Sequence, residues 1–204
     1  GGSIIKANII LTAAHCVHGY SIEQLRIRAG TSRCQKSGIV KKVENVYEHP
    51  EYDSLTYHND IAILKIIKPL HFDATISPIN LISKCTAVSE NAIGIVTGWG
   101  ISPNLESFVF SNNLRVVRLP RATDEDCANV YQQFNVTTMI CFGGNGGDDA
   151  CLSDSGGPVL VHTSDNSTEV IGIVSFGIGK MTTNVNYAKR KLRNEITRTG
   201  QIAT

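Results

Sequence analysis

The stretch IIKANIILTAAHC, residues 4–16, carries the two patterns that decide the fold. Residues 4–11 are mostly apolar and rich in isoleucine, which is typical of a buried β-strand. His15 follows the end of this strand, with small residues and Cys16 around it. We therefore treat His15 as a candidate functional residue, and the other histidines as structural or surface residues: His18, His49, His58, His71 and His162.

Short apolar segments of the same kind recur along the chain, separated by clusters of Gly, Asn, Ser, Asp and Pro. They predict further strands at residues 25–28, 39–46, 61–66, 93–99, 114–119, 159–161 and 170–174. Only two stretches predict helices: residues 123–131, where Thr123 is a good cap, and a C-terminal helix over about 188–198. The polar segment 81–91 is expected to link two halves. The pattern predicts an all-β chain of two sub-barrels, about residues 1–82 and 90–188.

Composition excludes several classes of function. The 204 residues contain 19 Lys and Arg against 18 Asp and Glu, a net charge of +1, so nothing in the balance indicates nucleic acid or an anionic membrane as a partner. Hydrophobic residues make up 42% of the chain and charged ones 18%, which excludes intrinsic disorder. Six cysteines favour an oxidising compartment, and the location is predicted to be secreted.

Two further motifs complete a chemical set with His15. Asp60 precedes the apolar run of the motif HNDIAIL, residues 58–64, and Ser155 lies in the glycine-rich turn of CLSDSGGP, residues 151–158. A serine hydroxyl becomes a nucleophile when a histidine removes its proton, and a carboxylate must orient that histidine. A glycine-rich turn lets backbone N–H groups point at the oxyanion. The three motifs together predict nucleophilic acyl transfer.

The motifs TAAHC, NDIAIL, TGWG (residues 97–100) and DSGGP occur here in the order found in chymotrypsin-family serine proteases. The chain resembles that family from Gly1 to about Ser175. The resemblance implies two perpendicular antiparallel six-stranded β-barrels with a short intermediate helix and a C-terminal helix, in a single peptidase domain over residues 1–204. TAAHCVHGY and YDSLTYHNDIA are most similar to mite trypsin-like allergens and their inactivated paralogues.

The resemblance also implies a secreted trypsin-like endopeptidase that cleaves after Arg or Lys, needs no metal or cofactor, and acts as a monomer on polypeptide substrates and protein inhibitors. Its residues map as follows: catalytic His15, Asp60 and Ser155; oxyanion-hole Ser153 and Ser155; substrate-binding Asp149, Ser175, Phe176 and Gly177; and Asp154 as the partner of the activating amine.

Three residues depart from the family pattern near this site. Ser153 stands where active members have glycine, and its Cβ opposes the backbone angles that an oxyanion donor needs. Lys180 replaces the cysteine that pairs with Cys151. Val185 is expected to narrow the wall of the specificity pocket. These changes favour an alternative function, a pseudoprotease that binds protein partners or inhibitors without cleaving them.

The resemblance also assigns cysteines and the chain start. It pairs Cys127 with Cys141 and places the partner of Cys16 just before Gly1. Mates for Cys34, Cys85 and Cys151 stay open, with a Cys34–Cys85 bridge as one alternative. The activating amine also lies before Gly1 in the family, so we expect an N-terminally truncated, zymogen-like chain with a disordered pocket and an uncompensated Asp154 carboxylate.

Overall fold

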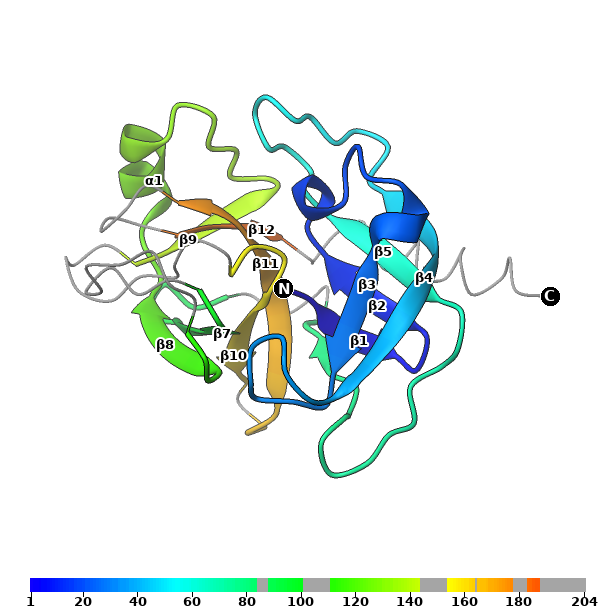
Figure 1. The fold of residues 1–204 in the computed structure, drawn as a ribbon. Coiled ribbons are helices and arrows are strands. Elements are labelled where there is room, and N and C mark those ends of the chain that lie inside the picture. The colour runs from blue at the N-terminus through cyan, green and yellow to red at the C-terminus, as the bar shows by residue number, and fades with distance from the viewer. Residues whose placement is uncertain (84–87, 101–110, 144–153, 164, 178–182, 188–204) are drawn as a thin grey trace.

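The computed structural model describes residues 1–83, 88–100, 111–143, 154–163, 165–177 and 183–187 (Figure 1). The first half contains β1 (Ser3–Lys6), β2 (Ile9–Thr12), the 3₁₀ helices η1 (Ala14–Cys16) and η2 (Ile22–Gln24), β3 (Arg26–Ala29), β4 (Ile39–Glu48), β5 (Ala62–Ile66) and β6 (Asn80–Leu81). The second half contains β7 (Ile93–Gly98), β8 (Arg115–Pro120), α1 (Asp124–Val130), β9 (Met139–Phe142), β10 (Pro158–His162), β11 (Thr168–Gly177) and β12 (Thr183–Tyr187).

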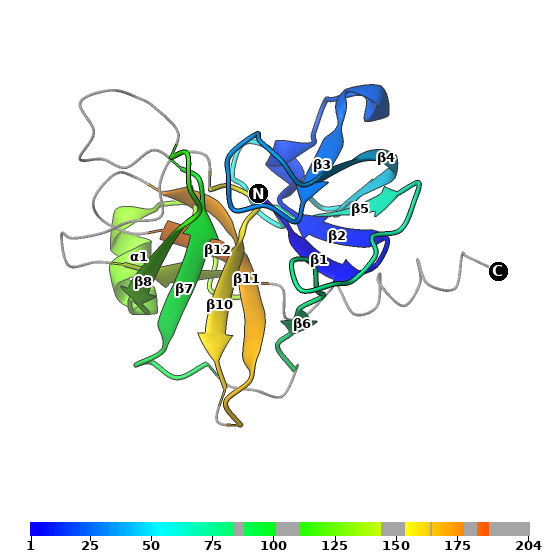
Figure 2. The same cartoon turned by 60° about the horizontal axis from the view of Figure 1, so that its bottom comes forward.

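The strands form two sheets, which confirms the predicted all-β, two-part architecture. The first sheet has the order β1-β2-β5-β4-β3. The second has the order β8-β7-β10-β11-β12-β9, and β6 also joins it by pairing in parallel with β11 (Figure 2). The two-barrel fold that the family resemblance implied fits this arrangement, and among the described residues the two sheets have five and seven strands. The difference arises because β6 leaves the first half and pairs with the second.

The stretch that opens the chain forms two strands, so its prediction as one strand over residues 4–11 is wrong. Ala7 and Asn8 make a turn between β1 and β2, and the two strands pair as an antiparallel hairpin. Asparagine favours such turns because its side chain can replace a backbone hydrogen-bond partner. The reversal brings Ile4 opposite Ile10, so both apolar runs lie in one sheet.

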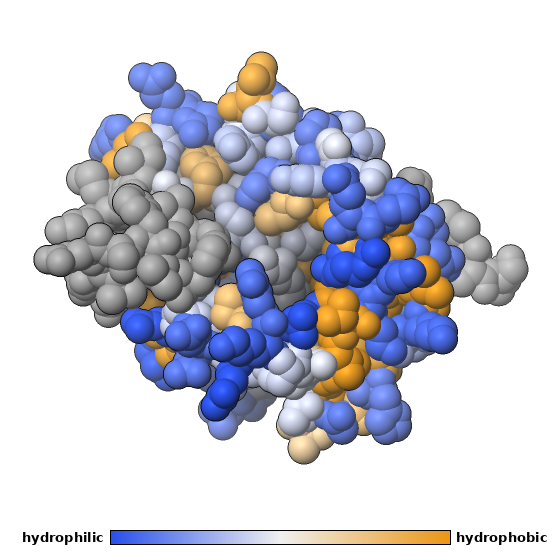
Figure 3. Space-filling model, viewed as in Figure 1, coloured by the Kyte–Doolittle hydropathy of each residue, from blue (hydrophilic) through white to orange (hydrophobic). Residues whose placement is uncertain are grey.

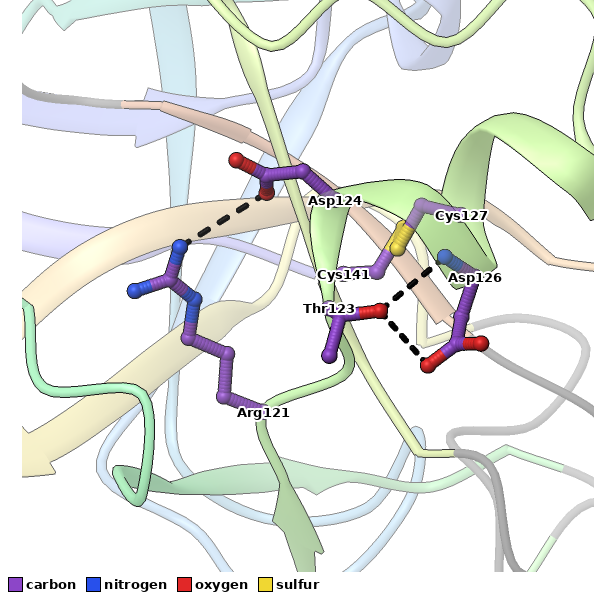
Figure 4. The surroundings of a disulfide bond; sticks show 6 residues. All are labelled: Arg121, Thr123, Asp124, Asp126, Cys127 and Cys141. Carbon is purple, nitrogen blue, oxygen red and sulfur yellow. Dashed lines mark hydrogen bonds and ion pairs between the residues drawn. A yellow bond between two sulfur atoms is a disulfide. The ribbon is translucent and has the colours of Figure 1, made fainter.

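Helix α1 confirms the predicted intermediate helix. The hydroxyl of Thr123 accepts a hydrogen bond from the backbone N–H of Asp126 at 3.0 Å, which caps the first turn (Figure 4). Cys127 on the helix forms a disulfide with Cys141 on β9, as the family resemblance implied. The predicted helix over 188–198 lies outside the described residues. No helix among the described residues is long and apolar enough to cross a membrane.

One cluster of buried side chains holds the two sheets together. Ile9, Leu11 and Ile63 from the first sheet pack with Val170 and Ile173 from β11, and all five are at most 8% exposed. The apolar core is therefore continuous from one half to the other, so the site residues on the two sheets are held in fixed relation.

Truncating this shared cluster should destabilise both halves at once. Ile173→Ala is expected to lower the free energy of unfolding by about 3 kcal/mol, because it leaves a cavity between the sheets. Urea unfolding followed by circular dichroism measures the change. Ile67→Ala is the matched control, because Ile67 is 54% exposed and should cost less than about 0.5 kcal/mol. Equal losses in the two variants would contradict the shared core.

Candidate active site

His15 and Asp60 come together at the ends of neighbouring strands. His15 lies in η1, directly after β2, and Asp60 lies just before β5, which pairs with β2. The backbone N–H of His15 donates to Asp60 Oδ1 at 2.8 Å, and the ring Nδ1 donates to Asp60 Oδ2 at 2.6 Å. Two contacts to one carboxylate fix both the backbone and the ring of His15. Its Nε2 is the ring nitrogen that Asp60 does not contact.

Ser175 ties this pair to the second sheet. Its hydroxyl, from β11, donates to Asp60 Oδ2 at 2.5 Å. The sequence resemblance placed Ser175 in a segment that pairs with substrate backbone, and the structure gives its side chain a separate contact. Asp60 is 0% exposed and Ser175 is 3% exposed. A buried carboxylate is tolerated when donors satisfy its oxygens, and here they come from both halves of the molecule.

Ser155 occupies a turn that only small residues permit. Gly156 has φ of +76°, and a Cβ there would collide with the hydroxyl of Thr12. The backbone N–H of Gly156 donates to the carbonyl of Val174 at 2.8 Å, which fixes the turn on β11. Ser155 itself accepts, at its carbonyl oxygen, a hydrogen bond from the nitrogen of Gly1 at 2.5 Å.

The structure brings His15 and Asp60 together but does not join Ser155 to them by a hydrogen bond. Among the described residues, the polar contact of His15 Nε2 is Cys16 Sγ, at 3.6 Å. The ring nitrogen that would accept the serine proton is therefore engaged by its chain neighbour.

Asp154 is nearly buried and lies against a glycine-rich strand end. Its Oδ1 accepts a hydrogen bond from the backbone N–H of Gly100 at 2.8 Å. A Cβ on Gly98 or Gly100 would collide with its carboxylate, so both positions need glycine. The backbone thus supplies one neutral donor to this carboxylate, and its ion pair with the activating amine stays a prediction.

A row of aromatic rings that no sequence motif indicates lies beside His15. The ring of Tyr57 lies 5.6 Å from that of His15 and 5.3 Å from that of Phe176, and Tyr131 lies 5.5 Å from Phe176. Tyr57 has φ of +58°, which is rare for a bulky residue and common at functional sites. The sequence signal was small: an aromatic three residues before Asp60.

The charges of the site favour a protonated histidine. Burial lowers the pKa of His15, but the hydrogen bonds and charges of Asp60 and Cys16 raise it, and the pKa lies at about 10. The imidazole of His15 therefore carries a proton at neutral pH in this arrangement.

Burial and the nearby charge of Asp60 also raise the pKa of Tyr52 to about 12.

Several predicted residues, and the pocket expected to be disordered, lie outside the described residues. They are Ser153, Asp149, Lys180, Cys85 and Cys151. Cys16 and Cys34 have free thiols. Phe176 and Gly177 lie on β11, and in its described part the chain has no group of three or more His, Cys, Asp or Glu placed to hold a metal ion.

Comparison with known proteins places these features in context. The family model described as "Trypsin" matches residues 1–191. The vitellin-degrading protease of Bombyx mori is 38% identical over 88% of this chain, which spans 66% of that protein. Trypsin 5G1 of Aedes aegypti is 35% identical over 88% of this chain, which spans 65% of that protein. A crystal structure of the scabies mite inactivated protease paralogue S-D1 superposes with a TM-score of 0.86 at 22% identity, covering 98% of this chain and 86% of that one.

The protonation of His15 can be tested by titration. In NMR spectra of histidine-labelled protein, His15 should titrate near 10, and in Asp60→Asn its pKa should fall to between about 7 and 9, because a neighbouring negative charge is lost. The folded pKa lies above the usual 6.5, so the stabilisation that the charged pair contributes is complete below pH 6.5 and is lost as pH rises through 10. A wild-type titration near 6.5 would contradict the arrangement.

Proposed function

This chain belongs to the trypsin family of serine proteases, and on that premise we propose that it is a secreted serine endopeptidase whose reaction runs through His15, Asp60 and Ser155. The observation that carries the proposal is the buried carboxylate of Asp60, held by His15 and Ser175. That network orients the imidazole of His15, and the proposed nucleophile Ser155 lies in a glycine turn. The chain spans about two thirds of the length of its first relatives, so the proposal concerns the full-length protein.

In the proposed reaction, Ser155 Oγ attacks the carbonyl carbon of a peptide bond while His15 Nε2 takes the hydroxyl proton. Asp60 holds the ring through Nδ1 and stabilises the imidazolium that forms. The protonated ring then gives its proton to the leaving amine, and an acyl-enzyme remains on Ser155. Water, deprotonated by the same ring, hydrolyses the ester and restores the free serine.

This role requires a neutral His15 whose Nε2 is free. The contact with Cys16 Sγ opposes both conditions. The family resemblance pairs Cys16 in a disulfide, and a disulfide sulfur carries neither a thiol proton nor a thiolate charge. We propose that the active form holds Cys16 in that bridge, which releases Nε2 for Ser155.

The finer properties are proposed on the same grounds. Asp149 at the base of the pocket would select Arg or Lys at the cleaved bond, and the backbone of residues 175–177 would pair with the substrate. Ser153 and Ser155 would supply the oxyanion N–H groups, and Asp154 would receive the amine that zymogen cleavage frees. The protein would be a secreted monomer, and its partners would be polypeptide substrates and protein inhibitors.

A pseudoprotease is the second candidate, and specific residues favour it. By the family resemblance, Ser153 would oppose the oxyanion geometry. Lys180 would leave the pocket without its disulfide and could neutralise Asp149, and Val185 would narrow the pocket. Such a protein would keep the fold and bind polypeptides or inhibitors without turnover.

The two candidates differ in turnover. The full-length, proteolytically processed protein should cleave a peptidyl-arginine chromogenic substrate, and Ser155→Ala should lower the rate by at least about 1000-fold. Cleavage of a peptidyl-phenylalanine substrate in place of the arginine one would contradict the role of Asp149. Rates equal to those of Ser155→Ala would establish the pseudoprotease.

The oxyanion hole can be tested separately from the nucleophile. Ser153→Gly should raise kcat about 10- to 1000-fold, because it permits the backbone conformation of the second donor. Labelling by a small fluorophosphonate, which needs Ser155 and His15 but little pocket, should occur in both forms. Equal kcat for the wild type and Ser153→Gly would refute the argument from Ser153, and Ser153→Ala controls for loss of the hydroxyl.

A further inference from the structure

The near-neutral charge of the chain hides a strong local excess. Residues 24–43 contain six cationic side chains and no acidic one, which leaves thirteen Lys and Arg against eighteen Asp and Glu in the remainder. The six are Arg26, Arg28, Arg33, Lys36, Lys41 and Lys42. The net charge of the whole chain is therefore small because a cationic segment offsets an acidic remainder. A cationic segment of this kind produces a local positive potential.

Arg26 and Arg28 lie on β3, Lys41 and Lys42 lie on β4, and the other two cations lie in the loop between these strands. Strand β3 is the last strand of the first sheet and pairs with β4, with Arg26 opposite Lys42 and Arg28 opposite Val40. Because successive strand residues alternate between faces, these four share one face. All four are exposed, whereas Ile27 between the two arginines packs against the core. The outward face of β3 and β4 is thus a cationic surface with an apolar residue in it.

Within the described residues, no acidic side chain neutralises the positive charge of these six cations. Like charges directly opposite each other, such as Arg26 and Lys42, destabilise a strand pair. In the described part of the chain, none of the six cations forms an ion pair. The guanidinium of Arg26 donates to the carbonyls of Glu23 and Leu25, and that of Arg28 donates to the carbonyl of Ser37. The two guanidinium groups are therefore held by neutral acceptors and keep their attraction for an anion.

Apolar side chains lie among the cations. Val40, on the same face as Arg26 and Lys42, is 49% exposed, and Ile67 is 54% exposed. The backbone N–H of Ile67 donates to the carbonyl of Lys42 at 3.2 Å, so Ile67 lies next to the cationic pair. Figure 3 shows hydrophobic and strongly hydrophilic side chains interleaved over β3 and β4. A ligand that matches this surface has both negative and apolar groups.

The surface is separate from the candidate active site. Strands β4 and β5 lie between β3 and β2, the strand that leads to His15. The loop that follows β3 is tied to the second half, because Trp99 Nε1 donates to the carbonyl of Ser32 at 2.9 Å and the backbone N–H of Cys34 donates to the carbonyl of Asn112 at 2.9 Å. A molecule bound along β3 would contact a rigid surface and leave His15 accessible.

From these observations we propose that the outer face and edge of β3 and β4 bind an extended acidic polypeptide segment with interspersed apolar side chains. Within the described residues β3 is the last strand of its sheet, so its outer edge offers backbone groups to an added strand, and the cations beside it select acidic residues. The exposed Val40 and Ile67 favour a polypeptide over a sulfated polysaccharide, because a polysaccharide has no apolar side chains to bury against them.

Binding can be measured without turnover in the full-length Ser155→Ala protein. The probe is a fluorescein-labelled synthetic peptide in which Asp and Glu alternate with Ile and Phe and which contains no Lys or Arg. We expect saturable binding by fluorescence anisotropy that weakens with added salt. Lys42→Gln should weaken it about threefold, and Lys36→Gln with Lys42→Gln about tenfold. Neither side chain donates a hydrogen bond among the described residues, so both variants should fold.

Two matched variants sharpen the test. Lys6→Gln removes an exposed cation from β1, the opposite edge of the same sheet, and should leave binding unchanged. Val40→Thr keeps the strand shape but loses apolar contact, and should weaken binding about threefold. The proposal is overturned by absent peptide binding, by equal effects of Lys6→Gln and Lys42→Gln, or by tighter binding of a heparin-derived oligosaccharide or anionic vesicles that Val40→Thr leaves unchanged.

Discussion

The carboxylate of Asp60 has no exposed surface, and removing such a group from water costs several kcal/mol unless donors replace the lost hydration. Three donors do so here: the backbone N–H of His15, its ring Nδ1, and the hydroxyl of Ser175. Two belong to the segment after β2 and the third to β11 in the other sheet. The carboxylate is therefore satisfied only when both sheets are formed and docked. Burial of Asp60 and assembly of the site are one event.

The same contacts that make Asp60 tolerable also set the charge of His15. A carboxylate at Nδ1 and a sulfur at Nε2 both favour the imidazolium, and together they outweigh the burial of the ring. Asp60 therefore orients His15 but also opposes its action as a base, because strong stabilisation of the imidazolium holds the proton on the ring. The group that contacts Nε2 decides whether the imidazolium or the neutral imidazole is favoured. Cys16 is the residue through which that balance can change.

Sequence reasoning was sound where the signal is local. The cap of α1 needs Thr123 and a backbone N–H three residues later, so the sequence contains it. The hairpin of β1 and β2 was read as one strand because a two-residue turn interrupts the apolar pattern too briefly to be seen. Strand β6 was missed because a pair of residues has no periodicity. The hydroxyl of Ser175 and the ring of Tyr57 acquire their places beside His15 only through packing between distant segments.

Strand β6 is short, yet it changes what the connection between the halves can do. Asn80 and Leu81 follow the first sheet in sequence and pair with Glu169 and Val170 of the second. The connecting segment is thus anchored to the sheet it leads toward, and the backbone N–H of Ile79 donates to Ile4 in the sheet it leaves. Residues 79–81 are thus fastened to both sheets and cannot act as a hinge. Rigid-body opening of one half against the other would break these hydrogen bonds and expose the shared core, so both oppose such a motion.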